Sequence, residues 1–197
     1  MNIEISNLTK SYGDQGIFRD YSLTIREHGI LVIMGSSGAG KTTLLRLLAG
    51  LEHQDAGTIT GTPEKVGMVF QEDRLCEEFS AVENVRLVLP RVSGREKGKT
   101  DQEIREHLKK VGIPEDSQNQ PVSEYSGGMK RRVALVRAMM ADAELLLLDE
   151  PCTGLDEDTK KQVMKYILEQ RGNRTMVVVT HSEEEAGGYG GELLLLK

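Results

Sequence analysis

The sequence predicts an α/β fold with a mainly parallel sheet, an N-terminal antiparallel β layer and a helical subdomain at about residues 72–140. Short apolar runs at residues 30–34, 145–148 and 176–180 are typical of buried strands in a parallel sheet. Turn-rich residues at 13–16 separate short β-type segments, which favours an antiparallel layer. Helical periodicity replaces these patterns in the middle of the chain, which indicates a helical insertion in the core.

Residues 35–43 fit the G-x-x-x-x-G-K-S/T pattern of a phosphate-binding loop (P-loop). Glycines let successive backbone N–H groups point at an anion, and the helix that follows adds the positive end of its dipole. A strand run precedes the motif and a leucine-rich helix pattern at residues 42–49 follows it, as the motif requires. We therefore expect a P-loop NTPase core whose nucleotide-binding residues are Gly35, Ser36, Ser37, Gly38, Ala39, Gly40, Lys41, Thr42 and Thr43.

Two acidic residues, Asp149 and Glu150, end the apolar run of a central strand. In a P-loop fold, the first acid is expected to hold Mg²⁺ together with the hydroxyl of Thr42, because Mg²⁺ prefers oxygen ligands. Lys41 is expected to reach the β- and γ-phosphates, and Glu150 to orient and deprotonate the attacking water. The structural alternative is a pair of solvated acids that close a strand.

The composition favours a soluble globular protein with a single domain over residues 1–197. Lys plus Arg number 25 against 31 Asp plus Glu, without a long basic block, so no nucleic-acid partner is expected. The chain lacks an apolar run of about 20 residues and an N-terminal secretory pattern, so the nucleotide chemistry is expected in the cytoplasm. Cys76 and Cys152 are expected to be free thiols.

Three polar or aromatic residues are further candidates because of their positions. Tyr12 lies just before a turn and could stack on a base. Gln71 ends a strand run and could coordinate Mg²⁺ or hold a water near the γ-phosphate. His181 follows the strand run at residues 176–180 and could donate a hydrogen bond to a γ-phosphate. Taken singly, each residue also fits a purely structural or incidental role.

Ser126, Gly127 and Gly128 open a helix that is expected to run to about residue 140. They form either an ordinary cap or a second anion site made from a serine hydroxyl and a helix N-terminus. Asp156 is expected to cap the helix at residues 157–169, and this capping could be its whole role.

Other segments are expected to be ordinary. Residues 91–100 are expected to form a mobile polar link, and residues 187–191 a flexible turn. The helix that Ser126 opens is expected to bury Val133, Val136 and Met140. It is also expected to present a solvated basic face formed by Lys130, Arg131, Arg132 and Arg137.

In this order, the motifs resemble those of the ATPase subunit of an ATP-binding cassette (ABC) transporter. The most specific part is Ser-Gly-Gly at a helix start about twenty residues before a strand that ends in Asp-Glu. The resemblance implies that Tyr12 stacks on the adenine of ATP and that Gln71 and Asp149 serve Mg²⁺. It implies further that Glu150 serves the water and that His181 contacts the γ-phosphate.

The resemblance also implies partners. Two ATPase subunits, identical or not, would form a homodimer or pseudo-dimer, with residues 126–128 of one contacting ATP on the other. Asp156 would help to join the two sites. The helical segment at residues 71–125 resembles the family's docking surface for transmembrane permease subunits. The chain would then lie on the inner face of the cell membrane and energise transport, with an extracytoplasmic substrate-binding protein as a further partner.

Two residues depart from the family pattern: Tyr125 and Met129 stand where leucine and glutamine are common. Two other functions stay open. A soluble ABC-type ATPase acting on DNA or ribosomes is disfavoured by the acidic charge and by the lack of an interrupting coiled coil. A P-loop kinase for a small metabolite would leave residues 126–128 without a purpose. The sequence names neither a transported substrate nor a direction of transport.

Overall fold

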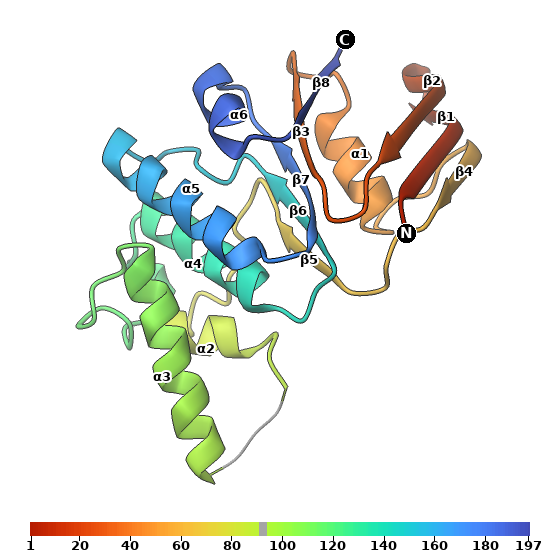
Figure 1. The fold of residues 1–197 in the computed structure, drawn as a ribbon. Helices are drawn as coiled ribbons and strands as arrows, with labels where there is room; N and C mark the ends of the chain where they lie inside the picture. The colour runs from red at the N-terminus through yellow and green to blue at the C-terminus, as the bar shows by residue number, and fades with distance from the viewer. Residues whose placement is uncertain (91–93) are drawn as a thin grey trace. The chain divides into compact units, whose positions relative to one another are not determined.

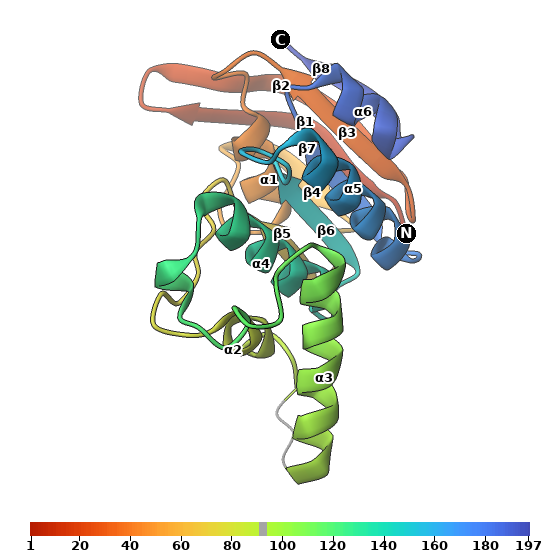
Figure 2. The same ribbon diagram turned by 90° about the vertical axis from the view of Figure 1, so that its left-hand side faces the viewer.

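A computed structural model describes residues 1–90 and 94–197, which form two compact units. Unit 1 comprises Met1–Met68, Ala143–Glu150 and Asn173–Lys197, and unit 2 comprises Val69–Asp142 and Pro151–Gly172. Figures 1 and 2 trace the chain through both units. The single domain expected from the composition stays a prediction.

The antiparallel layer of unit 1 contains β1 (Ile3–Tyr12), β2 (Gln15–Ile25) and β4 (Ala56–Thr60), in the order β2-β1-β4. The predicted layer is confirmed, but its first two strands are longer than the short segments expected. Only Gly13 and Asp14 separate β1 from β2. Register shifts along β1 let the ladder continue through its polar residues, so the polar interruptions do not end the strands.

The second sheet has the strand order β5-β6-β7-β3-β8. The strands β3, β6, β7 and β8 pair in parallel, as predicted from the apolar runs. Every residue of β6 and β7 is buried. The bounds are β3 (Ile30–Gly35), β5 (Val66–Val69), β6 (Leu145–Asp149), β7 (Thr175–Val179) and β8 (Glu192–Leu196).

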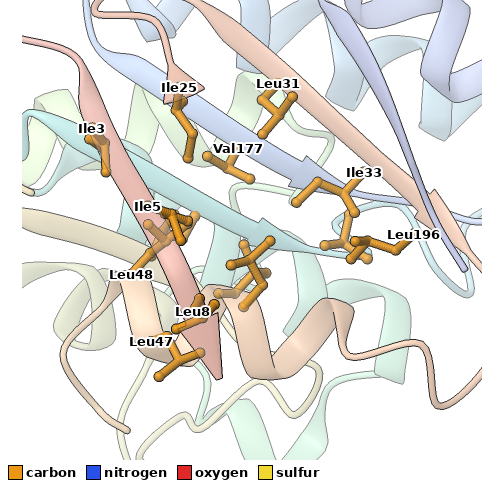
Figure 3. Packing of buried hydrophobic residues seen from close by; sticks show 14 of the residues in the cluster. Ile3, Ile5, Leu8, Ile25, Leu31, Ile33, Leu47, Leu48, Val177 and Leu196 are labelled. Atoms are coloured by element: carbon orange, nitrogen blue, oxygen red, sulfur yellow. The ribbon is translucent and has the colours of Figure 1, made fainter. Parts of the chain in front are cut away.

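Helix α1 (Lys41–Leu48) packs its leucines into the core of unit 1. Figure 3 shows Leu47 and Leu48 of this helix with Ile5 and Leu8 of β1. The same cluster includes apolar side chains from β3, β6 and β7, so α1 joins the antiparallel layer to the parallel sheet. This packing fixes the helix that begins at the P-loop.

Helix α6 (Glu183–Tyr189) includes residues 187–189, so the flexible turn expected at residues 187–191 is wrong for these three. The Ser182 hydroxyl accepts a hydrogen bond from the Glu185 amide, and three glutamates lie in the first turn of the helix. Both features stabilise a helix N-terminus. The side chain of Tyr189 is buried and anchors the last turn, and Gly190 ends the helix in the left-handed conformation.

The helices of unit 2 are α2 (Ala81–Arg86), α3 (Gly94–Lys110), α4 (Gly127–Met140) and α5 (Glu157–Arg171). A short 3₁₀ helix, Val122–Glu124, precedes α4. Helix α2 begins with a capping box, in which Ser80 and Glu83 bond each other's backbone. Figures 1 and 2 show α3 beside α2.

The mobile link expected at residues 91–100 is wrong for residues 94–100, which belong to α3. Residues 91–93 lie outside the described part of the chain. The stretch after Gly94 is rich in arginine, glutamate and lysine, which have high helix propensity. A glycine inside a helix costs only about 1 kcal/mol relative to alanine, so Gly98 does not end this one.

Helix α4 is buried on more than the expected stripe. Val133 and Val136 are buried as predicted, but Met140 is only half-buried. The solvated basic face is also wrong, because the side chain of Arg131 is one of the least exposed charged groups among the described residues. The other buried residues of this helix are Ala134, Leu135, Ala138 and Met139.

Both cysteines are free thiols, as predicted: Cys76 is exposed and Cys152 is buried. Within residues 1–90 and 94–197, no helix has the length and apolar character needed to cross a membrane.

Candidate functional site

Three neighbouring strands of unit 1, β6, β7 and β3, bring four predicted site segments to one edge of the sheet. Parallel strands end at the same edge, where α/β proteins bind ligands. Gly35 ends β3 and begins the P-loop, Asp149 ends β6, and Glu150 follows it. His181 follows β7 by two residues. The Glu150 amide donates a hydrogen bond to the Val179 carbonyl (3.0 Å), which ties the end of β6 to β7.

Gly40 shows why the P-loop needs glycine. Its φ is +90°, and a Cβ atom there would lie 2.6 Å from Ile17 Cγ2 and 2.9 Å from Phe18 Cζ. A larger residue would be strained by its backbone and crowded by β2 at once. At Gly35, a Cβ atom would collide with the Leu196 carbonyl of β8. The absence of a side chain at both positions thus lets the two ends of the loop lie close to neighbouring strands.

Helix α1 begins at Gly40 without a side-chain cap and without an acidic residue in its first turn. The N–H groups of its first turn therefore receive no side-chain oxygen, which suits an anion at this helix end. Among the helix starts that the structure describes, four others have a side-chain oxygen that accepts a backbone N–H. Their capping residues are Ser80, Ser126, Asp156 and Ser182.

Lys41 and Thr42 place a cation and a hydroxyl beside this helix end. The Lys41 ammonium donates to the Gly35 and Ser36 carbonyls, each at 2.8 Å, so the side chain folds over its own loop. Thr42 Oγ1 donates to Asp149 Oδ2 at 2.8 Å. Asp149 is 2% exposed and Thr42 is half-buried, so a buried carboxylate and a partly accessible hydroxyl lie side by side. One or two protein oxygens, with phosphate and water oxygens, are what Mg²⁺ uses at nucleotide sites.

Glu150 has a left-handed backbone, with a φ of +48°. A residue with a Cβ atom in this conformation is strained by roughly 1–2 kcal/mol, and such residues cluster at functional sites. Its Oε2 atom lies 3.6 Å from His181 Nδ1. The His181 side chain is the more exposed of the two, at 68% against 28%. An acid and an imidazole thus converge at the edge where the P-loop begins.

Tyr12, the last residue of β1, is 42% exposed. Lys10 lies below it, with its Nζ atom 5.0 Å from the ring centroid. That ammonium donates to the His53 carbonyl (2.8 Å), and the Lys10 side chain is only 10% exposed. The tyrosine therefore keeps one ring face on a fixed cation, a cation–π contact, while part of the ring faces outward.

In unit 2, Ser126 caps α4 as predicted, because its Oγ atom accepts a hydrogen bond from the Met129 amide (3.3 Å). Ser126 and Gly127 are exposed. Gly128 is half-buried, and a Cβ atom there would lie 3.2 Å from Leu155 Cδ2 and 3.5 Å from the Gly154 carbonyl. The second glycine of the motif thus allows the turn before α5 to approach α4 closely.

Asp156 caps α5 as predicted: its carboxylate accepts from the amide and the hydroxyl of Thr159, at 3.0 and 2.7 Å. These hydrogen bonds hold the pKa of Asp156 below its ordinary value. Gln71 lies in the same unit, is exposed, and follows the end of β5 by two residues. Unit 1 therefore contains Tyr12, the P-loop, Asp149, Glu150 and His181, and unit 2 contains Gln71, Ser126, Gly127, Gly128 and Asp156.

The family model of the ABC transporter matches residues 18–153. The chain belongs to the ABC transporter family. Solved cassettes of this family have the same fold. "Dimeric Structure of MJ0796, a Bacterial ABC Transporter Cassette" is 30% identical with a TM-score of 0.87, over 99% of this chain and 94% of that chain. A post-hydrolysis structure of the same cassette, described as dimeric and bound to ADP and Pi, has a TM-score of 0.86.

Relatives of this ABC cassette include two import ATP-binding proteins. The sulfate/thiosulfate import ATP-binding protein CysA of Escherichia coli K12 is 37% identical over 94% of this chain and 55% of its own length. The Fe(3+) ions import ATP-binding protein FbpC of Agrobacterium fabrum is 36% identical over 100% of this chain and 58% of its own length. The cassette spans only somewhat more than half the length of these relatives.

One departure of this ABC cassette from the family pattern has a structural explanation. Tyr125, which precedes the Ser-Gly-Gly motif, is 7% exposed and donates its hydroxyl proton to the Ser117 carbonyl (2.7 Å). Burial raises the pKa of this tyrosine. Its ring is part of the interior of unit 2, so it supports α4 from within. Nothing in the structure explains the methionine at position 129.

Sequence reasoning missed the roles of the arginines in this ABC cassette's α4. Arg132 donates to the Val111 and Gly112 carbonyls at the end of α3 (2.9 and 2.8 Å). Arg131 and Arg137 donate to the segment after β5. A signal for Arg131 was present, because it precedes Leu135 by four residues and so falls on that residue's buried face.

Proposed function

We propose that this chain binds and hydrolyses ATP and thereby energises transport of a substrate across a membrane, through separate transmembrane permease subunits. The observation that carries the proposal is the convergence of the P-loop, the Thr42–Asp149 pair and the Glu150–His181 pair at one sheet edge. Membership of the ABC transporter family supports it.

The P-loop binds the triphosphate. Its backbone N–H groups and the uncapped start of α1 attract anionic oxygens. Lys41 has three donors, of which two engage the Gly35 and Ser36 carbonyls, so the third is available to a β- or γ-phosphate oxygen. Tyr12, supported from below by Lys10, offers its ring to the adenine. The remaining contacts come from Ser36, Ser37, Gly38, Ala39 and Thr43.

The oxygen pair of Thr42 and Asp149 fits Mg²⁺, and Gln71 is its third candidate ligand. When bound, Mg²⁺ would neutralise charge on the phosphate oxygens. The burial of Asp149 keeps its carboxylate in one orientation toward Thr42.

Glu150 accepts a proton from the attacking water through its carboxylate. The water oxygen bonds to the γ-phosphorus, and the bond from that phosphorus to the bridging oxygen breaks, releasing ADP and phosphate. His181 donates a hydrogen bond to the γ-phosphate and, at 3.6 Å from Glu150 Oε2, also orients that carboxylate. The strained backbone of Glu150, held by its bond to Val179, fixes the direction of the acid.

Two such cassettes assemble so that Ser126, Gly127 and Gly128 of one contact the ATP of the other. Asp156 lies near the interface and helps to join the two sites. The exposed Ser126 hydroxyl and the start of α4 are suited to a phosphate. The similar cassette whose structures are described as dimeric supports this arrangement. The second cassette is either a copy of this chain or a related one.

The chain acts on the cytoplasmic face of the membrane, held there by the permease subunits that dock on its helical segment at residues 71–125. The names of the import ATP-binding relatives support this assignment and also imply an extracytoplasmic substrate-binding protein. Those relatives are named for sulfate or thiosulfate and for Fe(3+), which differ in charge. The partners, and not this chain, therefore select the transported substrate.

The Glu150→Gln variant tests the proposal. With Mg-ATP, we expect this variant to bind nucleotide, to hydrolyse it at least 100-fold more slowly than the unmodified chain, and to form dimers detectable by light scattering. The matched control is Glu144→Gln, which removes a carboxylate just before the opposite end of β6 and should keep full activity. A monomeric Glu150→Gln protein that hydrolyses ATP at the normal rate would contradict both the acid's role and the dimer.

A further inference from the structure

The segment of residues 70–80, called the Gln71 segment below, lies between β5 and α2 and has no helix or strand of its own. Gln71 is exposed, yet the backbone around it is bonded to side chains from two helices. A loop fixed by side chains from elsewhere keeps its position only as long as those side chains do.

Arg131 of α4 is the side chain that bonds the Gln71 segment at its start. Its Nη1 atom donates to the carbonyl of Phe70, to that of Gln71 at 3.4 Å, and to the Asp73 carboxylate at 3.1 Å. Phe70 is 61 residues away in the chain. One guanidinium nitrogen thus bonds the carbonyls of the two peptide groups that flank the Gln71 Cα atom, and also the carboxylate of Asp73.

Other side chains hold the rest of the Gln71 segment. Arg137 donates to the Asp73 and Arg74 carbonyls, at 2.9 and 2.8 Å. Asn84 of α2 is fully buried, donates to three carbonyls of the segment and accepts from the Cys76 amide (2.8 Å). Because the later part is bonded independently of Arg131, removal of Arg131 should loosen Gln71 without releasing the whole segment.

The burial of Arg131 argues that its bonds matter. Its side chain is 6% exposed, and burying a guanidinium has a large desolvation cost that only well-placed acceptors offset. Leu135 and Ala138 lie four and seven residues further along the same helix face and are apolar. An apolar residue at position 131 would pack on that face at lower cost, but it could not bond Gln71.

We propose that Arg131 is a positioning residue that ties Gln71 to α4, so that Gln71 and the Ser126-Gly127-Gly128 motif move as one body. Ser126 caps the same helix five residues before Arg131. The inference rests on the proposed ATPase function. It adds that a displacement of the motif, as its nucleotide is bound or released, is passed directly to the residue that serves Mg²⁺ and the attacking water.

The test compares Arg131→Met with Lys130→Met in the full chain. Lys130 is the neighbouring basic residue of α4 and pairs at 2.8 Å with the exposed Glu77, six residues after Gln71, so its variant controls for loss of a charge and of a contact to the far part of the segment. We expect Arg131→Met to lower the kcat of ATP hydrolysis about tenfold with the KM for ATP within about twofold, because substrate binding rests on the P-loop. Lys130→Met should keep both constants within about twofold.

A double-mutant cycle with Gln71→Ala separates positioning from a general effect. In the Gln71→Ala background, Arg131→Met should lower kcat by no more than about twofold, because the group it positions is gone. A further tenfold loss in that background would overturn the proposal. Inactivity of the unmodified chain and of Lys130→Met would instead refute the proposed function, so the two failures are distinguishable.

Arg131→Lys keeps the cycle usable if the methionine variant does not fold. The three bonds named above share the two N–H groups of Nη1, and a lysine ammonium offers three N–H donors. We expect Arg131→Lys to recover kcat to within about threefold of the unmodified chain, because its ammonium can donate to the same acceptors. A folded lysine variant as slow as a folded methionine variant, or one that slows the Gln71→Ala protein further, would overturn the proposal.

Discussion

The P-loop of unit 1 and the Gln71 segment of unit 2 are both irregular loops that follow a strand, but they are fixed in opposite ways. The P-loop is shaped mainly from within: Gly38 and Gly40 have positive φ angles, and Lys41 bonds carbonyls five and six residues before it. The Gln71 segment is shaped from outside, by arginines 58 to 64 residues later in the chain. One loop depends on its own sequence, and the other depends on the helix that follows it, α2, and on the distant helix α4.

This difference determines how each loop fails. A locally determined loop changes only when its own residues change, and the rest of the fold tolerates the change. A loop held by buried side chains is coupled to the stability of the unit that supplies them. Substitutions in the P-loop should therefore reduce the affinity for ligand more than the free energy of unfolding. Substitutions around the Gln71 segment should reduce the free energy of unfolding, with or without a loss of affinity.

The largest expected effect is that of Gly40→Ala on nucleotide binding. The methyl group meets Ile17 and Phe18 while the backbone stays at a φ of +90°. Left-handed strain of roughly 1–2 kcal/mol and crowding of about 1–3 kcal/mol should make the loop relax away from its binding conformation. We expect an affinity for ATP about 100-fold weaker, measured by titration calorimetry.

Gly38→Ala is the matched control for Gly40→Ala. Its φ is +83°, but no atom lies within 4 Å of the added methyl group, so only the strain remains. We expect a loss of affinity of about tenfold. Equal losses for the two variants would show that crowding by β2 does not shape the loop.

Asn84→Leu should produce the second largest effect, this time on stability. The buried amide makes four hydrogen bonds to the Gln71 segment, and leucine makes none of them. The Cys76 amide loses its acceptor, while the three carbonyls each keep a backbone N–H donor, so the free energy of unfolding should fall by about 2 kcal/mol in urea denaturation. Asn119→Leu, at an exposed position of the same unit, should change it by less than about 0.5 kcal/mol.

Features determined by nearby residues could be predicted from the sequence, and features determined by distant residues could not. The P-loop, the strand that ends in Asp149 and the caps at Ser126 and Asp156 were predicted, because their signals lie within a few residues. The partners of Arg131 were not predicted, because a basic residue on a helix is usually solvated and its acceptors lie far away in the chain. The helical path of residues 94–100 and 187–189 was missed because glycine was weighted above its neighbours.

Ser126→Ala tests a local contact in unit 2, the cap of α4. The cap bond to Met129 is local, as in the P-loop, but it stabilises a helix that carries non-local bonds. Alanine should lower the free energy of unfolding by about 1 kcal/mol, and Ser126→Gly by only a few tenths. If Ser126 also contacts ATP across a dimer, both variants should lose ATPase activity alike, although their stabilities differ. Activity that follows stability would leave capping as the only role of the hydroxyl.

The smallest effect concerns His107 of α3, whose Nδ1 atom lies 2.8 Å from the Tyr166 hydroxyl of α5. Burial, with a contribution from Lys110, lowers the pKa of this histidine in the folded state. Between that pKa and the unfolded value of about 6.5, the unfolded chain binds more protons, so stability falls as the pH falls below about 6.5.

His107→Gln removes this dependence and keeps a side chain able to bond Tyr166. The unfolding free energy of the unmodified chain should therefore decline more steeply than that of His107→Gln between about pH 6.5 and 5. The other histidines are common to both proteins and cancel in the difference. Parallel curves would mean that the folded state does not disfavour the protonated form of His107.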